Sequence, residues 1–153
     1  MTRFFVGLKL EQRANSDKPL EHPAAIINLS SITAVEHIYQ QSIYGSSKAL
    51  IHNFSQSLHV ELSDKNFHVL SATPSYVSTR FNSFKNGFWD ITPNQCAVGI
   101  LKDLAVAKTH SYPSIKQEML HHVVDLLGCI DSRIRDWLST WQFEKSILHL
   151  QNM

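Results

Sequence analysis

Cysteine is scarce in this chain, and its charges nearly cancel. The 153 residues include two cysteines, Cys96 and Cys129, which form no C-x-x-C pair. Two cysteines at this spacing build no disulfide framework, so a reduced, cytosolic compartment fits best. The formal net charge is +1, and the lysines and arginines are scattered rather than gathered in a stripe. The electrostatic footprint of a nucleic-acid-binding protein is absent, and we expect no nucleic acid partner.

Long apolar runs are absent as well. A helix needs roughly 18 to 20 predominantly apolar residues to span a bilayer. The best candidate, residues 119–130, is interrupted by His121, His122 and Asp125. We therefore predict no transmembrane segment in this chain and expect residues 119–130 to form a packed helix.

Glycine is limited to five positions: Gly7, Gly45, Gly87, Gly99 and Gly128. Dinucleotide-binding folds need a glycine-rich turn after the first strand, where the backbone approaches the pyrophosphate at a helix N-terminus. The five glycines never approach that spacing. We expect the chain alone to bind a dinucleotide poorly or not at all.

Histidine is abundant, but its spacing is not that of a metal site. His121 and His122 are adjacent and cannot face the same way on a helix, and His52 with His59 lacks a third ligand at a useful spacing. We predict no metal site and expect the histidines to lie at the surface.

The apolar segments that are present predict an α/β fold in a single globular unit, with 43% apolar and 18% charged residues. Residues 24–29 are apolar without alternation, which is typical of a parallel strand covered on both faces. Residues 44–63 are predicted to form an amphipathic helix, and residues 67–72 a second strand that Pro74 ends. The core-facing stripe of that helix is indicated by Leu50, Phe54, Leu58 and Leu62, with Ile51 beside them. Strand, helix and strand in this order make one crossover unit.

The flanking segments complete the expected outline. Residues 1–12 suit a helix lying on a sheet, and residues 13–23 a loop. The aromatic segment 75–93 is either a flap over a binding site or a loop packed on its own core, and both interpretations remain open. Residues 94–108 read as a helix and residues 109–114 as a third short strand.

Two closing helices are expected at the end of the chain, over residues 114–128 and 132–149. Trp137 and Trp141 lie on one side of the second helix. They suit either an interfacial membrane face or the core. Core packing is the favoured interpretation, because the polar side carries charges of both signs.

Tyr44 and Lys48 stand at the start of the predicted helix 44–63. One helical turn separates them, so the phenol and the ammonium lie on the same face. A cation beside a tyrosine favours the phenolate and brings proton transfer closer to neutral pH. Ser31 stands thirteen residues earlier, after the first strand, so one loop can bring both hydroxyls onto one carbonyl oxygen. Taken alone, the Tyr44 and Lys48 pair is better explained as an exposed helix pair without a chemical role.

The order of three motifs resembles the short-chain dehydrogenase/reductase family. These motifs are Ile-Ile-Asn-Leu-Ser-Ser at residues 26–31, Tyr-Gly-Ser-Ser-Lys at residues 44–48, and Pro-Ser-Tyr-Val-Ser-Thr at residues 74–79. Within that family the chain is similar to the branch of 17-beta-hydroxysteroid dehydrogenases and very-long-chain 3-oxoacyl-CoA reductases. Tyr-x-x-x-Lys alone is weak evidence, but the combination is fairly specific.

The resemblance implies a role for each matching residue and an NADP(H) cofactor. Ser31 would hydrogen-bond the substrate carbonyl, and Tyr44 would give or take the proton. Lys48 would hold the nicotinamide ribose beside Tyr44 and lower the pKa of its phenol. The nicotinamide carboxamide would be contacted by residues after the second strand: Pro74, Val77 and Thr79.

The departures from the family pattern concern its first half. The chain has Ser75 where much of the family has glycine, and it lacks both the Asn-Asn-Ala-Gly stretch and the upstream asparagine of the catalytic tetrad. The expected fold is therefore the C-terminal half of a Rossmann-like doubly wound parallel sheet, with about three strands flanked by helices. We expect residues 1–153 to form one partial domain, with a catalytic core at 24–80, a substrate-loop region at 81–93 and C-terminal helices at 94–153. Such a chain would be a fragment, a truncated isoform or a degenerate paralogue.

The resemblance implies NADP(H)-dependent reduction of a small-molecule ketone, of the 3-oxoacyl-CoA or 17-ketosteroid type. By analogy this places the chain in lipid metabolism and fatty acid elongation at the endoplasmic reticulum membrane, or otherwise in the cytoplasm. The alternative is an inactive remnant that acts only by pairing with another subunit. The strand 24–29 would then keep an apolar edge that seeks a partner. Because the helices 1–12 and 44–63 form a dimer face in the family, we expect a homo- or heterodimer.

Overall fold

The computed structural model describes residues 7, 11, 24–80, 87–138, 140 and 141. Within them, three parallel strands form a sheet in the order β1-β2-β3. The strands are β1 (Ala24–Leu29), β2 (Phe67–Ala72) and β3 (His110–Ser111). The α/β prediction of a partial Rossmann-like sheet is confirmed. Four predicted segments lie wholly or partly outside the described residues. They are the helix 1–12 except residues 7 and 11, the loop 13–23, the first six residues (81–86) of the substrate-loop region 81–93, and the end of the last helix.

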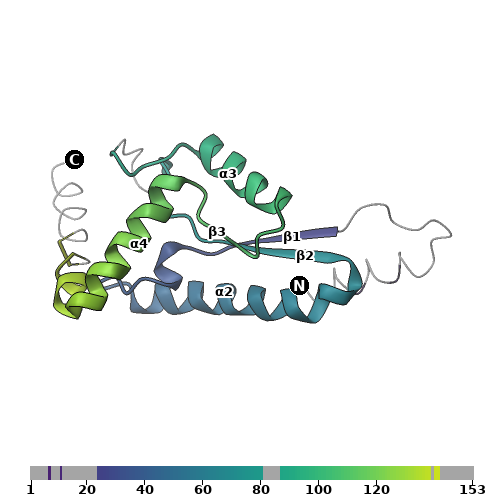
Figure 1. Cartoon of the computed structure of the whole chain (residues 1–153), viewed down its shortest axis with the longest axis horizontal. Coiled ribbons are helices and arrows are strands. Elements are labelled where there is room, and N and C mark those ends of the chain that lie inside the picture. The colour runs from purple at the N-terminus through teal and green to yellow at the C-terminus, as the bar shows by residue number, and fades with distance from the viewer. Residues whose placement is uncertain (1–6, 8–10, 12–23, 81–86, 139, 142–153) are drawn as a thin grey trace.

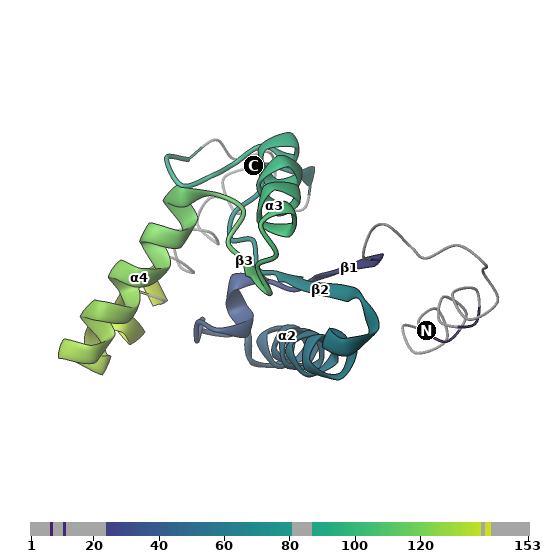
Figure 2. The same cartoon turned by 45° about the vertical axis from the view of Figure 1, so that its right-hand side comes forward.

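Helices cover the two faces of β2. Helix α2 (Ser42–Leu62) lies along one face of the sheet and α3 (Pro93–Ala105) lies on the other, as Figures 1 and 2 show. Side chains of a strand alternate between faces, so Phe67 and Val69 pack against the C-terminal half of α2, while Leu70 and Ala72 pack against α3. The central strand is therefore buried on both sides, as expected for a parallel sheet.

The expectation that β1 is covered on both faces is wrong within the described residues. Its residues alternate between half-buried and exposed, and Ile27 and Leu29 remain 41% and 57% exposed. Asn28 faces the covered side and donates to Ser55 of α2 at 2.9 Å. The other face is open because α3 contacts β2 and β3 rather than β1.

The inward face of α2 also differs from the predicted stripe. Leu58 and Leu62 are buried, but Leu50 is 72% exposed and Phe54 is also exposed. A repeat of four residues advances about 40° beyond a full turn, so Leu50 points about 80° away from Leu58. The buried side of the helix follows Ser55 instead.

Helix α3 begins at a capping box. The Thr92 side chain accepts from Gln95 N, and Thr92 N donates to the Gln95 side chain. This cap starts the helix one residue before the predicted position and α3 ends earlier, at Ala105. Its buried residues are Cys96 and Ile100.

Helix α4 (Ile115–Ile130) follows β3, and residues 132–138 begin a further helix beside it. The expectation that residues 119–130 form a packed helix is wrong on one face of α4, where large apolar side chains stay exposed: Ile115, Met119, Val123, Leu126 and Ile130. Trp137 and Trp141 are exposed as well and stack on each other at 6.4 Å, so they are not core residues. In the described part of the chain, no helix is long and apolar enough to cross a membrane.

Candidate functional site

The loop that leaves β1 places two serines at the rim of the sheet. Ser30 N donates to Ala72 O at 2.7 Å, and Ile32 N donates to Pro74 O at 3.0 Å. These bonds tie the loop to the parallel segment that leaves β2. Ser31 caps the short 3-10 helix η1 (Ile32–Ala34), because its hydroxyl accepts from the backbone N–H two residues later. Both serines are buried.

Lys48 is directed toward the sheet rather than into solvent. Its Nζ donates to Leu29 O at 3.3 Å and lies 5.7 Å from the centroid of the Tyr44 ring. The Ser30 hydroxyl donates to Lys48 O at 2.7 Å, which fixes this turn of α2 against the loop after β1. Tyr44 itself is partly exposed, so its phenol is accessible to a ligand. The amine and the phenol thus lie on one face of α2, as their spacing predicts.

A close approach at Gly45 brings the start of α2 to the serine loop. A Cβ at this position would lie 3.0 Å from Thr33 O of η1. Glycine therefore lets the helix that carries Tyr44 sit directly against the segment that follows Ser31. This explains why a glycine stands between two polar residues in the first turns of α2, where it otherwise weakens a helix.

One cavity of about 270 Å³ collects all the predicted site residues at the carboxyl ends of β1 and β2. In open parallel sheets, ligands bind at that end of the strands. The Ser31 hydroxyl accepts from Thr33 N, which leaves its own proton to donate to a ligand. The predicted residues that line this cavity are Ser31, Tyr44, Lys48, Pro74, Val77 and Thr79.

Gln117 is part of the frame of this site, and sequence reasoning missed it. Its side chain is 1% exposed; it accepts from Ser75 N at 3.1 Å and donates to Tyr76 O at 3.0 Å. The loop Pro74–Thr79 is thereby held by α4, forty residues further along the chain. The loop is also fixed by Ser78 N, which donates to Ile91 O at 2.8 Å. No local pattern around Gln117 could have indicated this contact.

Tyr76 is a second phenol in the cavity wall that the sequence did not single out. Burial, together with the negative charge of Asp90, raises the pKa of Tyr76 above its ordinary value. Tyr76 therefore stays protonated and is available as a hydrogen-bond donor rather than as a base.

The histidines contradict the surface expectation at three positions. His52 of α2, His110 of β3 and His121 of α4 lie in a column of rings between the helices and the sheet, with Tyr112 between the last two. His52 and His110 bond the Ser71 and Thr73 hydroxyls. This column joins three elements behind the candidate site. Within the described residues, no group of three or more histidine, cysteine, aspartate or glutamate side chains is placed to hold a metal ion.

Part of the chain matches a known protein family. Residues 16–87 match the family described as short chain dehydrogenase. This matched segment contains Ser31, Tyr44 and Lys48, together with the loop Pro74–Thr79. Just under half of the chain therefore resembles the short-chain dehydrogenase family.

Relatives within the family are longer than this chain. It is 29% identical over 116 residues to the very-long-chain 3-oxoacyl-CoA reductase of Bos taurus, covering 74% of this chain and 34% of that protein. It is 28% identical over 123 residues to the hydroxysteroid dehydrogenase-like protein 1 of Gallus gallus, covering 76% and 34%. The chain thus spans about a third of the length of these curated relatives.

The fold is shared with solved short-chain dehydrogenases. A short-chain dehydrogenase from Burkholderia cenocepacia, solved in complex with NADP, superposes with a TM-score of 0.61 over 72% of this chain and 48% of that chain. Its sequence identity is 20%, so the likeness concerns the fold alone.

The described residues fit one end of such a dinucleotide. An ammonium and several hydroxyls line a cavity large enough for a nicotinamide and its ribose. The 153 residues contain no glycine-rich turn for the pyrophosphate. The fit is therefore to the nicotinamide end only.

Proposed function

We propose that this short-chain dehydrogenase site reduces a ketone to an alcohol with NADP(H), and that the ketone is a 3-oxoacyl-CoA or a 17-ketosteroid. The observation that carries the proposal is the gathering of a buried serine, a tyrosine and a lysine in one cavity beside the Pro74–Thr79 loop. The names of the mammalian and avian relatives support the substrate class. A location at the endoplasmic reticulum membrane is proposed for this chain from the family resemblance.

Each residue has a stated part in the proposed reaction. Ser31 holds the carbonyl oxygen through its hydroxyl, and Tyr44 passes its phenolic proton to that oxygen. Lys48 lies beside the Tyr44 ring and stabilises the phenolate left behind. A bound nicotinamide supplies the hydride. The segment of Pro74, Val77 and Thr79 contacts the nicotinamide end of the cofactor.

Replacement of the phenol tests this assignment. The chain is joined at its N-terminus to a dinucleotide-binding segment that contains a glycine-rich turn. Turnover is followed by the loss of NADPH absorbance with a 3-oxoacyl-CoA or a 17-ketosteroid. Tyr44→Phe should lower turnover by at least roughly a hundredfold, as expected for a lost general acid, while NADPH affinity changes little. Tyr39→Phe, outside the cavity, is the matched control and should retain activity.

Two outcomes contradict the proposal. Retained turnover in Tyr44→Phe would remove the phenol from the reaction. A folded chimera that binds NADPH but reduces neither class of ketone would show that the site is no longer competent.

A second function, of another class, is favoured by the open side of the sheet. Among the described residues β1 is an edge strand, and its outer face exposes Ile27 and Leu29. An apolar edge of this kind pairs readily with another chain. The second candidate is therefore a non-enzymatic subunit that acts by homo- or heterodimerisation.

A further inference from the structure

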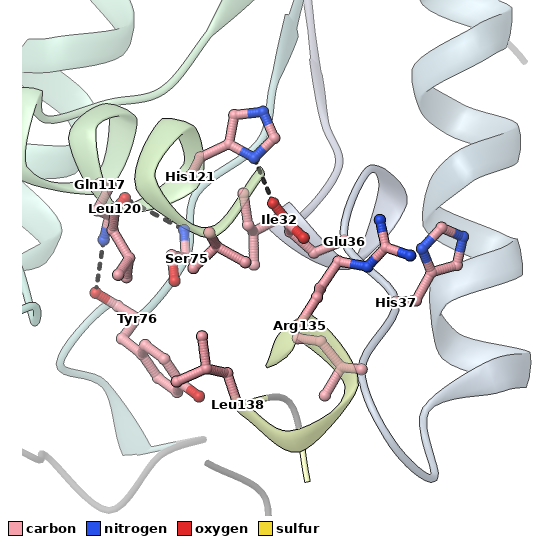
Figure 3. A pocket seen from close by; sticks show the side chains of 12 residues that line it. Ile32, Glu36, His37, Ser75, Tyr76, Gln117, Leu120, His121, Arg135 and Leu138 are labelled. Atoms are coloured by element: carbon pink, nitrogen blue, oxygen red, sulfur yellow. Dashed lines mark hydrogen bonds and ion pairs between the residues drawn. The ribbon is translucent and has the colours of Figure 1, made fainter. Parts of the chain in front are cut away.

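A second cavity, of about 50 Å³, is lined by the side chains drawn in Figure 3 and shares part of its wall with the candidate catalytic cavity. The two cavities share four lining residues: Ile32, Ile38, Ser75 and Tyr76. These residues form the boundary between the two cavities, so a molecule that presents its carbonyl to Ser31 and Tyr44 lies next to the second cavity.

Arg135 lies in the wall of the second cavity, and its side chain has no hydrogen-bond or ion-pair partner among the described residues. Its Nε is buried. Figure 3 shows the guanidinium extending from its helix toward the loop that carries Glu36 and His37. A buried guanidinium N–H without an acceptor is rare in folded proteins. The Arg135 guanidinium is therefore available to donate a hydrogen bond to a ligand.

The position of Arg135 is set by a glycine of α4. A Cβ at Gly128 would lie 3.2 Å from Arg135 Cδ, so the side chain lies directly against the α4 backbone. Arg133, two residues earlier, differs from Arg135 both in its exposure and in having an ion-pair partner. Its side chain is 89% exposed, and it pairs with Asp131 at 3.0 Å. Only one of these two neighbouring arginines is therefore presented to a cavity.

The rest of the cavity defines the kind of ligand. Most of its remaining wall is apolar, with Leu120, Val124 and Leu138. The carboxylate of Glu36 accepts a hydrogen bond from His121 Nδ1 at 2.5 Å, so it is already engaged. A singly charged, planar carboxylate matches the fork of a guanidinium. A doubly charged phosphate would be repelled more strongly by Glu36 and fits this small space less well.

We propose that Arg135 binds a carboxylate, and that the ketone of this site carries that carboxylate on a short apolar chain. The link to a ketone rests on the proposed function, whereas carboxylate binding itself requires neither cofactor nor turnover. Arg135 is thus a specificity-determining residue, and within the proposed ketone reduction it would select a free 3-oxo acid over the CoA thioester or the steroid named above.

Direct binding to the full 153-residue chain tests this assignment. Isothermal titration measures three probes with the same apolar chain: sodium octanoate, octanamide and octyl phosphate. We expect octanoate to bind, and octanamide and octyl phosphate to bind at least several-fold more weakly. Arg135→Gln should weaken octanoate binding by roughly tenfold or more, the loss expected for a charge-assisted hydrogen bond. Arg133→Gln is the matched control and should change the affinity by less than about twofold.

The outcomes separate this inference from the proposed function. Tyr44→Phe should leave octanoate affinity unchanged, because Tyr44 does not line the second cavity; lost turnover in that variant therefore says nothing against the carboxylate site. Equal affinity for octanoate and octanamide, or no octanoate binding, overturns the proposal even if Arg135→Gln fails to fold. Tighter binding of octyl phosphate shows that the carboxylate class is wrong. An equal loss of octanoate affinity in Arg133→Gln and Arg135→Gln also contradicts the assignment of the carboxylate to Arg135.

Discussion

Lys48 illustrates how single residues of the site depend on their neighbours. Its spacing from Tyr44 places both side chains on one face of the helix. The direction of the Lys48 amine, however, depends on its hydrogen bond to Leu29 O, and the position of the Lys48 backbone depends on the hydrogen bond from the Ser30 hydroxyl. The histidines make the same point. His110 is a residue of β3, yet its surroundings come from α2, α3 and α4.

His110 leads to a prediction about acid stability. Burial, with the neighbouring imidazoles of His52 and His121, lowers the pKa of His110 to about 4 from its ordinary value of 6.5. Lys108 lowers it further, while Asp103 opposes the shift. Between about pH 6.5 and pH 4 the unfolded chain binds a proton that the folded chain excludes. Stability is therefore complete above pH 6.5 and falls as the pH decreases, by at most about 3 kcal/mol.

Urea denaturation at pH 7 and pH 4.5 measures this loss. His110→Gln keeps a polar partner for Thr73 but does not titrate, so it should lose less stability between the two pH values than the unchanged chain. His37→Gln, at an exposed position, is the control and should behave like the unchanged chain. An identical pH dependence in all three proteins would rule out His110 as the source.

At the scale of elements, α4 acts as a brace for the loop that follows β2. The loop Pro74–Thr79 has no regular structure of its own apart from the bridge between Val77 and Ile91. Its backbone is satisfied from outside by Gln117. An element far along the chain thus shapes the wall of the candidate cavity.

Removal of this brace should be costly. Gln117→Leu leaves the buried Ser75 N without an acceptor and removes one of the two donors to Tyr76 O, which keeps its bond from Ile91 N. We expect this to lower the free energy of unfolding by about 2 kcal/mol. Gln56→Leu removes a single hydrogen bond, to Thr109 O, and should cost about 1 kcal/mol. Urea denaturation of both variants gives the comparison. Equal or reversed losses would show that Gln117 does not brace the loop.

At the scale of the whole molecule, the sheet and its helices leave large apolar surfaces open. The outer face of β1 and one side of α2 both expose large side chains, among them Ile27 and Leu50. Exposed apolar patches of this kind are typical of interaction surfaces. They are candidate surfaces for the pairing that the family resemblance implies.

Self-association tests which surface pairs. Sedimentation velocity of the chain should show a species larger than the monomer as the concentration rises. Ile27→Lys should abolish it if the sheet face pairs, and Leu50→Lys if the α2 face pairs, because a buried unpaired charge is strongly unfavourable. Val106→Lys alters an exposed residue after α3 and serves as the control. A chain that stays monomeric at all concentrations contradicts homodimerisation.

The sequence by itself determined the element types, the parallel β1-α2-β2 unit and the family, because strand and helix periodicities and three short motifs are local properties. The Tyr44 and Lys48 pair could be placed on one face for the same reason. Only the tertiary structure decided which faces are buried: apolar content alone could not show that α3 leaves β1 uncovered, or that Leu50 turns away from Leu58. The contacts of Gln117, His110 and Arg135 were equally unpredictable, since each partner lies on a segment distant in sequence and is brought near only by packing.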